Sequence, residues 1–289
     1  MLSLLTLLTL AIVTVAFLRP FSAKATAPLV HKSHSFATSK HVKRSSNNLV
    51  YHSGQVMEGT ANAYAIFWEP TGSYVSPQYN SLIMQYFKDI GSSSLYHNDT
   101  QYKDTANIAP ASAVLAGSWV DTAGYPSGTL SDAQIQAEVT HAQSVNGWSS
   151  SLSNLFFVFT AKGEQLCIDS STCFGSTFCA YHGNFGNTLY AAMPYTGTYL
   201  SGCGVPSSPN KDFDADSTIN VTSHEQNEAA TDPLGTAWYD SVGNEIGDKC
   251  AWKFGTLNSA GGDVTWNGHS YEVQKEWDNK VKGCVLAGP

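Results

Sequence analysis

The stretch Ser223–Asp232, with the sequence SHEQNEAATD, constrains the fold of this chain more than any other. Three carboxylates precede it, and carboxylates favour a helix N-terminus because the unpaired N–H groups there carry partial positive charge. Pro233 follows directly and ends the pattern, since proline cannot continue a helix. The stretch is therefore predicted to form the second half of one helix, which begins near the carboxylates Asp212, Asp214 and Asp216.

Two side chains of this helix are spaced to bind one metal ion. Four residues make little more than one helical turn, so His224 and Glu228 project from the same side. Glu225 lies beside them, within reach of a water molecule on the metal. A His followed by Glu, with a second ligand four residues after the His, is typical of zinc-binding helices, although Glu228 stands where the common pattern has His.

A third ligand has to come from elsewhere, and the segment Asn244–Asp248 is the best candidate. The layout resembles that of the thermolysin-like metallopeptidases, the gluzincins, in which a Glu ligand on a second helix follows the helix motif. The resemblance implies that Glu245 is a metal ligand and that Asp248 orients His224. It also implies that Tyr239, between the two ligand segments, steadies the oxyanion that forms during hydrolysis.

A second resemblance covers most of the chain after residue 50. The chain resembles the secreted EXORDIUM-like, phosphate-induced protein family, especially its bacterial and fungal-type members. The segments that carry the resemblance are Val50–Gly54, Tyr64–Trp68, Phe178–His182, the run HEQNEAATDPLGTAWYD, and Glu245–Cys250.

Family membership alone does not imply catalysis, and a His-Glu-x-x-Glu pattern also occurs on solvated helices. The rival prediction is therefore a non-enzymatic EXORDIUM-like extracellular or cell-wall-associated protein. In that case the carboxylates form a structural or vestigial metal site, or a hydrogen-bonded cluster.

The charge distribution divides the chain and excludes one class of partner. Six of the fifteen basic residues precede residue 45, while no acidic residue precedes Glu58. From residue 45 onward nine basic residues face 23 acidic ones, a net charge of −14. We expect no nucleic acid partner, because phosphate binding needs clustered Lys and Arg.

The N-terminal region predicts export. Residues 1–27 read as a signal peptide, an apolar run that ends in a small-x-small cleavage site at Ala25–Ala27. An uncleaved membrane anchor is the alternative for that run, and no other segment is expected to cross a bilayer. Residues 28–49 read as a basic linker or pro-segment with a dibasic pair, Lys43–Arg44. Residues 50–289 are predicted to form one zincin-like catalytic domain.

The six cysteines indicate disulfides, because an even number in an exported chain favours disulfides over thiolate ligands. Proximity and the family resemblance favour three pairs, and the partners in the first two could be exchanged. The pairs are Cys167–Cys173, Cys179–Cys203 and Cys250–Cys284.

Alternating strand and helix patterns predict an α/β or α+β fold in a single zincin-like domain. We expect a mixed sheet packed against the metal-bearing helix, with disulfide-pinned loops. Either residues 189–195 or the run before them should border the cleft and pair with an extended peptide. The predicted strands are 62–68, 112–120, 155–161 and 189–195, the helices are 77–90 and 131–145, and a hairpin is expected within 263–277.

Together these patterns predict a secreted zinc-dependent hydrolase, and a metallopeptidase above all. His224, Glu228 and Glu245 would hold Zn²⁺, or another divalent ion because the ligand set is acidic, and Glu225 would act as general base. The substrate would be an extended peptide or protein, and the enzyme a monomer. His269 is a weaker oxyanion candidate than Tyr239, and His182 is another possible cleft residue, although the sequence favours a core histidine.

Overall fold

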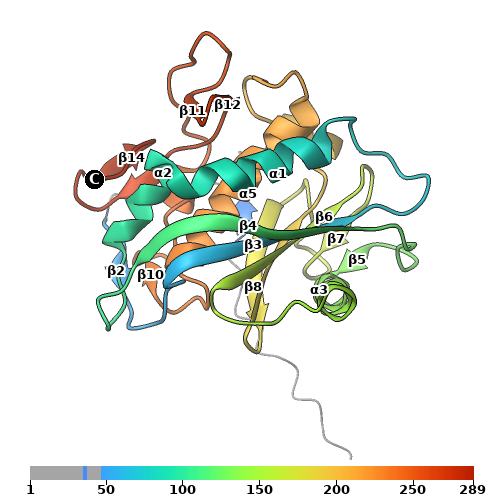
Figure 1. Ribbon diagram of the computed structural model, residues 1–289, viewed down its shortest axis with the longest axis horizontal. Coiled ribbons are helices and arrows are strands. Elements are labelled where there is room, and N and C mark those ends of the chain that lie inside the picture. Colours follow the sequence, from blue (N-terminus) through green and yellow to red (C-terminus); the bar gives the residue numbers. More distant parts are fainter. Residues whose placement is uncertain (1–34, 38–46) are drawn as a thin grey trace, which may run out of the picture.

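The structure, a computed structural model, describes residues 35–37 and 47–289. The predicted signal peptide and the dibasic pair lie outside the described residues. A six-stranded mixed sheet forms the centre of the molecule (Figure 1). Its strands, in spatial order, are β1 (Ser35–Ala37), β8 (Phe178–Phe185), β9 (Thr188–Met193), β6 (Asn154–Thr160), β3 (Gly59–Trp68) and β4 (Pro110–Asp121).

The sheet changes direction at one side. Strands β9, β6, β3 and β4 run parallel to one another. β8 precedes β9 in the chain and pairs antiparallel with it across a tight turn at Gly186, and β1 pairs antiparallel with β8. Every residue of β6 is buried, as expected for a strand covered on both faces of a sheet.

Two helices provide the crossover connections and lie on opposite faces of the sheet (Figure 1). α1 (Tyr79–Asp89) leads from β3 to β4, and α3 (Asp132–Asn146) leads from β4 past β3 to β6. The two connections cross the sheet in opposite directions, so right-handed crossovers place their helices on opposite faces. α3 begins at Ser131, whose N–H donates to Gln134 Oε1 at 2.8 Å, and ends at Gly147 with φ 69°.

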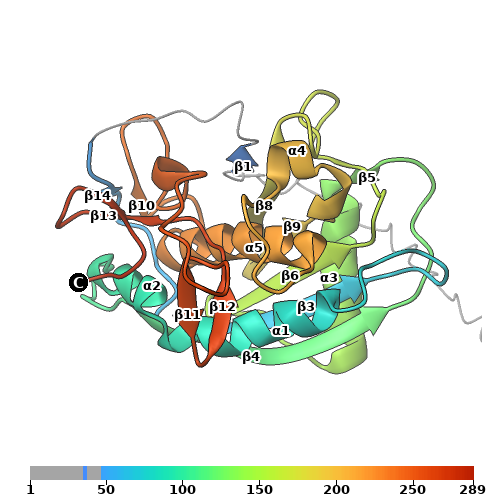
Figure 2. The ribbon, with the colours of Figure 1, turned by 90° about the horizontal axis from the view of Figure 1, so that it is seen from above.

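The predicted metal-bearing stretch lies in α5 (Phe213–Thr231), the longest helix in the described part of the chain. Asp212 Oδ1 accepts from the N–H of Ala215 at 3.1 Å and caps its first turn. α5 packs beside α1 and against β8 and β9 (Figure 2). Every residue from Ala215 to Thr231 is buried, although most are polar. Burial of polar groups costs free energy unless they are hydrogen-bonded, so this helix is not built for stability alone.

The remaining elements are short and lie around the sheet. They form four two-stranded sheets: β10 with β2, β11 with β12, β13 with β14, and β5 with β7. Their bounds are β2 Val50–Tyr51, β5 Leu130–Ser131, β7 Leu166–Cys167, β10 Trp238–Tyr239, β11 Val264–Trp266, β12 His269–Tyr271, β13 Glu276–Asp278 and β14 Gly283–Val285. The short helices are η1 Ile90–Ser92, α2 Ser94–His97, η2 Asn98–Gln101, η3 Thr196–Thr198, α4 Leu200–Cys203 and η4 Asp248–Cys250.

The three favoured disulfides are confirmed: Cys167–Cys173, Cys179–Cys203 and Cys250–Cys284. The mixed α/β class and the central mixed sheet are confirmed as well. The expected hairpin is present but shorter, with Asn267 and Gly268 at positive φ between β11 and β12.

Two expectations need correction. Glu245 does not lie on a second α-helix, because the segment around it is a loop that ends in the single 3-10 turn η4. Of the two strands predicted to pair with an extended peptide, β9 is excluded, because β6 and β8 already occupy both of its edges. The other candidate, β8, pairs with β9 on one side and with the N-terminal strand β1 on the other. Among the described residues, no helix combines the length and apolarity that a membrane span needs.

Candidate metal centre

The helix spacing brings together the two side chains that it predicts. His224 Nε2 lies 3.1 Å from Glu228 Oε1, and both side chains are fully buried. One turn of α5 separates them, so the contact follows from helix geometry. Their position among β8, β9 and α1 is set by the packing of the whole helix.

The loop before η4 approaches this pair through its backbone. The N–H of Asp248 donates to Glu228 Oε1 at 2.9 Å, and Asp248 Oδ1 lies 3.9 Å from His224 Nε2. Gly247 makes the approach possible, because a Cβ there would lie 2.5 Å from His224 Nδ1. Any larger residue would have to push the loop away from the imidazole.

A small apolar cluster, separate from the main core, holds this loop in place. It comprises Leu49, Tyr102, Ile246, Cys250 and Trp277. The disulfide from Cys250 ties the loop to β14. The loop position is thus fixed by packing and by a covalent bond, rather than by the polar groups alone.

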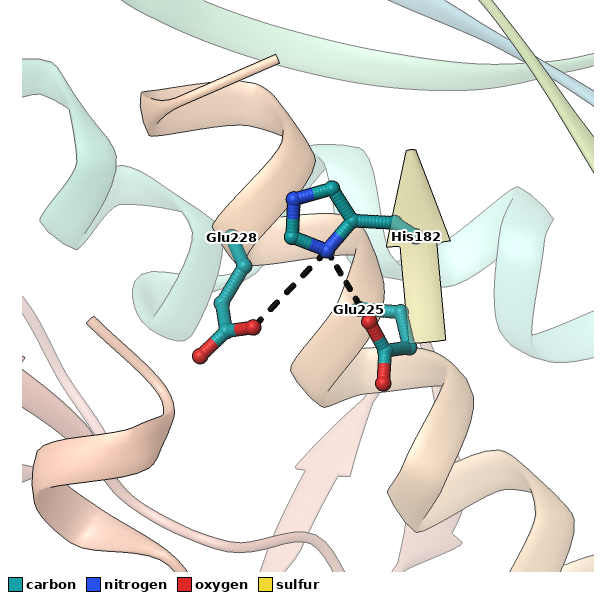
Figure 3. Close-up of side chains that lie close together, drawn as sticks. All are labelled: His182, Glu225 and Glu228. Atoms are coloured by element: carbon teal, nitrogen blue, oxygen red, sulfur yellow. Dashed lines mark hydrogen bonds and ion pairs between the residues drawn. The ribbon is translucent and has the colours of Figure 1, made fainter. Parts of the chain in front are cut away.

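His182 on β8 joins the centre from the other side (Figure 3). Its Nδ1 lies 3.0 Å from Glu225 Oε2 and 3.8 Å from Glu228 Oε2. Its Nε2 lies 3.9 Å from Glu245 Oε2. One imidazole from the sheet therefore contacts carboxylates from both α5 and the loop.

Glu245, the predicted third ligand, is fully buried beside these groups. Burial raises its pKa well above the usual value, and the neighbouring carboxylates of Glu228, Asp232, Asp248 and Glu225 raise it further. Each additional negative charge in a buried site disfavours ionisation of the next. A divalent cation bound among these carboxylates would favour their ionised form instead.

Gln274 sets the protonation of His224. Its Nε2 donates to the carbonyl oxygen of Gly247 at 3.0 Å, and its Oε1 accepts from the N–H of Trp252 at 3.3 Å. With the amide held in this orientation, Nε2 also lies 3.0 Å from His224 Nδ1, which must accept. Neutral His224 then carries its proton on Nε2, the nitrogen that lies 3.1 Å from Glu228 Oε1. Burial lowers the pKa of His224, while the charges of Glu225 and Asp248 oppose that effect.

Among the residues that the structure describes, two groups of side chains have ligand atoms close enough to share a cation. One comprises His224, Glu228 and Asp248, the other His182, Glu225 and Glu228, with all ligand atoms of a group within 4.8 Å of one another. Tetrahedral zinc with bonds near 2.1 Å separates its ligand atoms by about 3.4 Å. The 3.1 Å and 3.9 Å distances from His224 Nε2 fit that spacing. Binding there requires Nε2 to be deprotonated and the Gln274 amide to turn over.

The predicted oxyanion residues lie outside these groups. Tyr239, in β10, pairs with Val50 and stacks on the imidazole of His52, with ring centroids 3.7 Å apart. His269, in β12, contacts Asp89 with its Nδ1 at 2.8 Å. Asp248, predicted to orient His224, lies on the Nε2 side of the ring, and Gln274 faces Nδ1 instead.

Sequence reasoning ranked His182 too low and missed Gln274. His182 was predicted to be a core histidine, although the run Phe178–His182 carried part of the family resemblance. That shared run was the available signal. No pattern in the sequence pointed to Gln274, since its contact with His224 joins residues 50 apart in the chain.

Comparisons with known proteins bear on the family rather than on the chemistry. No protein-family model matches this chain, and no solved structure matches it. The chain is similar to Protein EXORDIUM-like 5 of Arabidopsis thaliana, with 26% identity over 314 aligned residues that cover 89% of this chain and 83% of the relative. This similarity supports the EXORDIUM-like family. The relative and the three disulfides are consistent with an extracellular protein.

Proposed function

We propose that this protein is a secreted, zincin-like metal-dependent hydrolase that cleaves peptide bonds. The observation that carries the proposal is the meeting of buried His224 and Glu228 with the partly exposed Asp248, next to Glu225 and His182. His224 and Glu228 would hold Zn²⁺ or another divalent cation together with a carboxylate of the loop, either Asp248 or the predicted ligand Glu245. A bound cation would polarise the scissile carbonyl and make water more acidic.

Glu225 would act as the general base in this reaction. It would take a proton from the attacking water and pass it to the leaving nitrogen. His182 Nδ1, 3.0 Å from Glu225 Oε2, restricts where that carboxylate can point. The oxyanion role of Tyr239 stays a prediction, and it would require the ring to leave its stack on His52.

The acidic ligand set distinguishes this centre from one with two His and one Glu. Two carboxylates and one imidazole neutralise a divalent cation, so water on it would be less acidic than at a site with a net positive charge. An oxygen-rich set also suits harder cations than zinc. The identity of the cation is therefore part of the test.

Metal content and proteolysis, measured on the same preparations, test the proposal. We expect His224→Ala to lose stoichiometric metal and activity on an unfolded protein substrate together. Glu225→Gln should keep the metal and lose activity by about 10²–10⁴-fold, because it keeps the shape and removes the base. A fully active Glu225→Gln protein would contradict the mechanism.

One observation favours a second function, a non-enzymatic EXORDIUM-like extracellular protein. Gln274 Nε2 lies 3.0 Å from His224 Nδ1 and Glu228 Oε1 lies 3.1 Å from His224 Nε2, so both ring nitrogens have polar neighbours without any cation. On this alternative, purified protein binds no stoichiometric metal, and Gln274→Glu has no effect on metal content. On the metal proposal, Gln274→Glu accepts from Nδ1–H and raises metal affinity, as carboxylate partners of metal-binding histidines do.

A further inference from the structure

The outer edge of β8 is a place where an extended chain pairs with the sheet. β9 takes one side of β8, and β1 takes the other. The pairing is antiparallel, with Ser35 opposite Tyr181, Phe36 opposite Ala180 and Ala37 opposite Phe178 (Figure 2 shows β1 as the small blue arrow beside β8). Without β1, this edge would present unpaired N–H and C=O groups, which any extended peptide could use.

This edge adjoins the candidate metal centre. Tyr181, the partner of Ser35, directly precedes His182, whose imidazole contacts Glu225. β1 also lies against α5, the helix that carries Glu225 and Glu228. A peptide backbone on this edge therefore lies next to the proposed general base.

The segment that occupies the edge, β1, precedes the main body of the fold, which comprises residues 49–289. The body begins near Leu49, whose N–H donates to Asn279 Oδ1 at 2.9 Å and whose C=O accepts from Asn279 Nδ2 at 2.9 Å. Residues 38–46 connect that anchor to β1, and they include the dibasic pair Lys43–Arg44. The described part of β1 is three residues long, and its attachment to the same chain raises its effective concentration.

We infer that the β8 edge is an acceptor for extended peptides running antiparallel to it, and that residues 35–37 fill it in the intact chain. Cleavage between β1 and Leu49 turns the segment from a tethered competitor into a free peptide that dilution removes. The peptide-binding property stands by itself, while an effect on hydrolysis rests on the proposed function.

A chain that is cut after folding tests this inference. A site for a specific protease replaces Lys43–Arg44 in the full chain, and the folded protein is measured before and after cutting and gel filtration. The probe is a fluorescent peptide with the sequence of residues 31–40, followed by anisotropy. We expect the cut protein to bind the probe at least tenfold more tightly than the uncut protein, because the tethered competitor is gone.

Two further probes separate strand pairing from other binding. In an antiparallel pair, alternate N–H groups point toward the partner strand. Peptides N-methylated at Ser35 or at Phe36 should therefore differ, and one of them should bind at least tenfold more weakly than the unmodified probe. Equal binding by both methylated peptides overturns strand pairing, and equal binding by cut and uncut protein overturns occupancy by residues 35–37. Tighter binding without any hydrolysis contradicts the proposed peptidase and supports the acceptor edge.

Discussion

The segment from Asp240 to Lys249 contributes to two buried carboxylate centres that differ in how their charge is balanced. Asp240 lies 3.3 Å from Lys249 Nζ and accepts backbone N–H groups from Val242 and Asn244. Burial alone would raise its pKa, yet these N–H groups and the ammonium hold the pKa below its usual value. A few residues away, burial and the neighbouring carboxylates of Glu228, Asp232, Asp248 and Glu225 raise the pKa of Glu245 well above its usual value.

The difference shows which of the two centres serves the fold. A paired carboxylate that accepts hydrogen bonds can stay ionised in the interior, and breaking such a pair is costly. A group of buried carboxylates around His224 costs stability at neutral pH unless protons or a cation compensate. This contrast supports the proposal that the His224 centre is functional, whereas the Asp240–Lys249 pair serves the fold.

The largest expected effect breaks the structural pair. Asp240→Ala leaves the ammonium of Lys249 buried without its carboxylate and removes the acceptor for two backbone N–H groups. We expect a loss of about 3–5 kcal/mol in the free energy of unfolding, measured by urea denaturation with a chelator present. Adding Lys249→Met should recover part of that loss. A loss below about 1 kcal/mol would show that the pair contributes no more to stability than a solvent-exposed ion pair does.

A divalent cation should sharpen the contrast between the centres. At a free concentration a hundred times its dissociation constant, a bound cation raises the free energy of unfolding by about 2.7 kcal/mol. We expect Glu228→Gln to lose most of that gain, as followed by thermal unfolding with and without Zn²⁺. Glu272→Gln is the matched control, since this buried carboxyl belongs to neither metal group and should keep the gain. Equal gains in both variants would place the cation elsewhere.

Glu245→Gln should have opposite effects with and without a cation. The raised pKa of Glu245 means that its carboxyl costs stability as pH rises above the unfolded value of 4.5. In the presence of a chelator at neutral pH, the Gln variant should therefore be more stable by about 1 kcal/mol or more. With the cation present it should be less stable if Glu245 is the third ligand. Stabilisation under both conditions would leave Asp248 as the loop ligand.

The smallest expected effect concerns Glu138, a buried carboxyl that belongs to neither metal group. Burial raises the pKa of Glu138 to about 8, and the neighbouring carboxylate of Asp121 contributes to the shift. For an acid whose folded pKa exceeds its unfolded pKa, stability is greatest below the unfolded value and declines until the folded value is reached.

Glu138→Gln does not ionise, so its melting temperature should exceed that of the wild type by a margin that grows from about pH 4.5 to about pH 8. We expect a margin of about 2–4 °C for each kcal/mol gained, read by calorimetry across that range. A constant margin would mean that the carboxyl titrates normally. Added cation should not change this result, in contrast to Glu245.

Much of the fold followed from local patterns. The predicted helix begins after Asp212 and ends before Pro233. The 3.6-residue period of the helix alone places His224 and Glu228 together. Ser131 likewise caps the N-terminus of α3 and Gly147 its C-terminus, as the capping preferences of Ser and Gly indicate. The disulfide between Cys250 and Cys284 joins neighbours in the order of the cysteines.

The side chains that surround α5 could not be predicted from the sequence in the same way. The sequence by itself determined that His224, Glu225 and Glu228 share one region of one helix, because their spacing is fixed by hydrogen bonds between residues four apart. Only the tertiary structure decided that His182 meets Glu225, that Gln274 faces His224 and that Asp248 approaches Glu228. Those contacts depend on strand order and loop packing, which are set by burial of the whole core rather than by any local period.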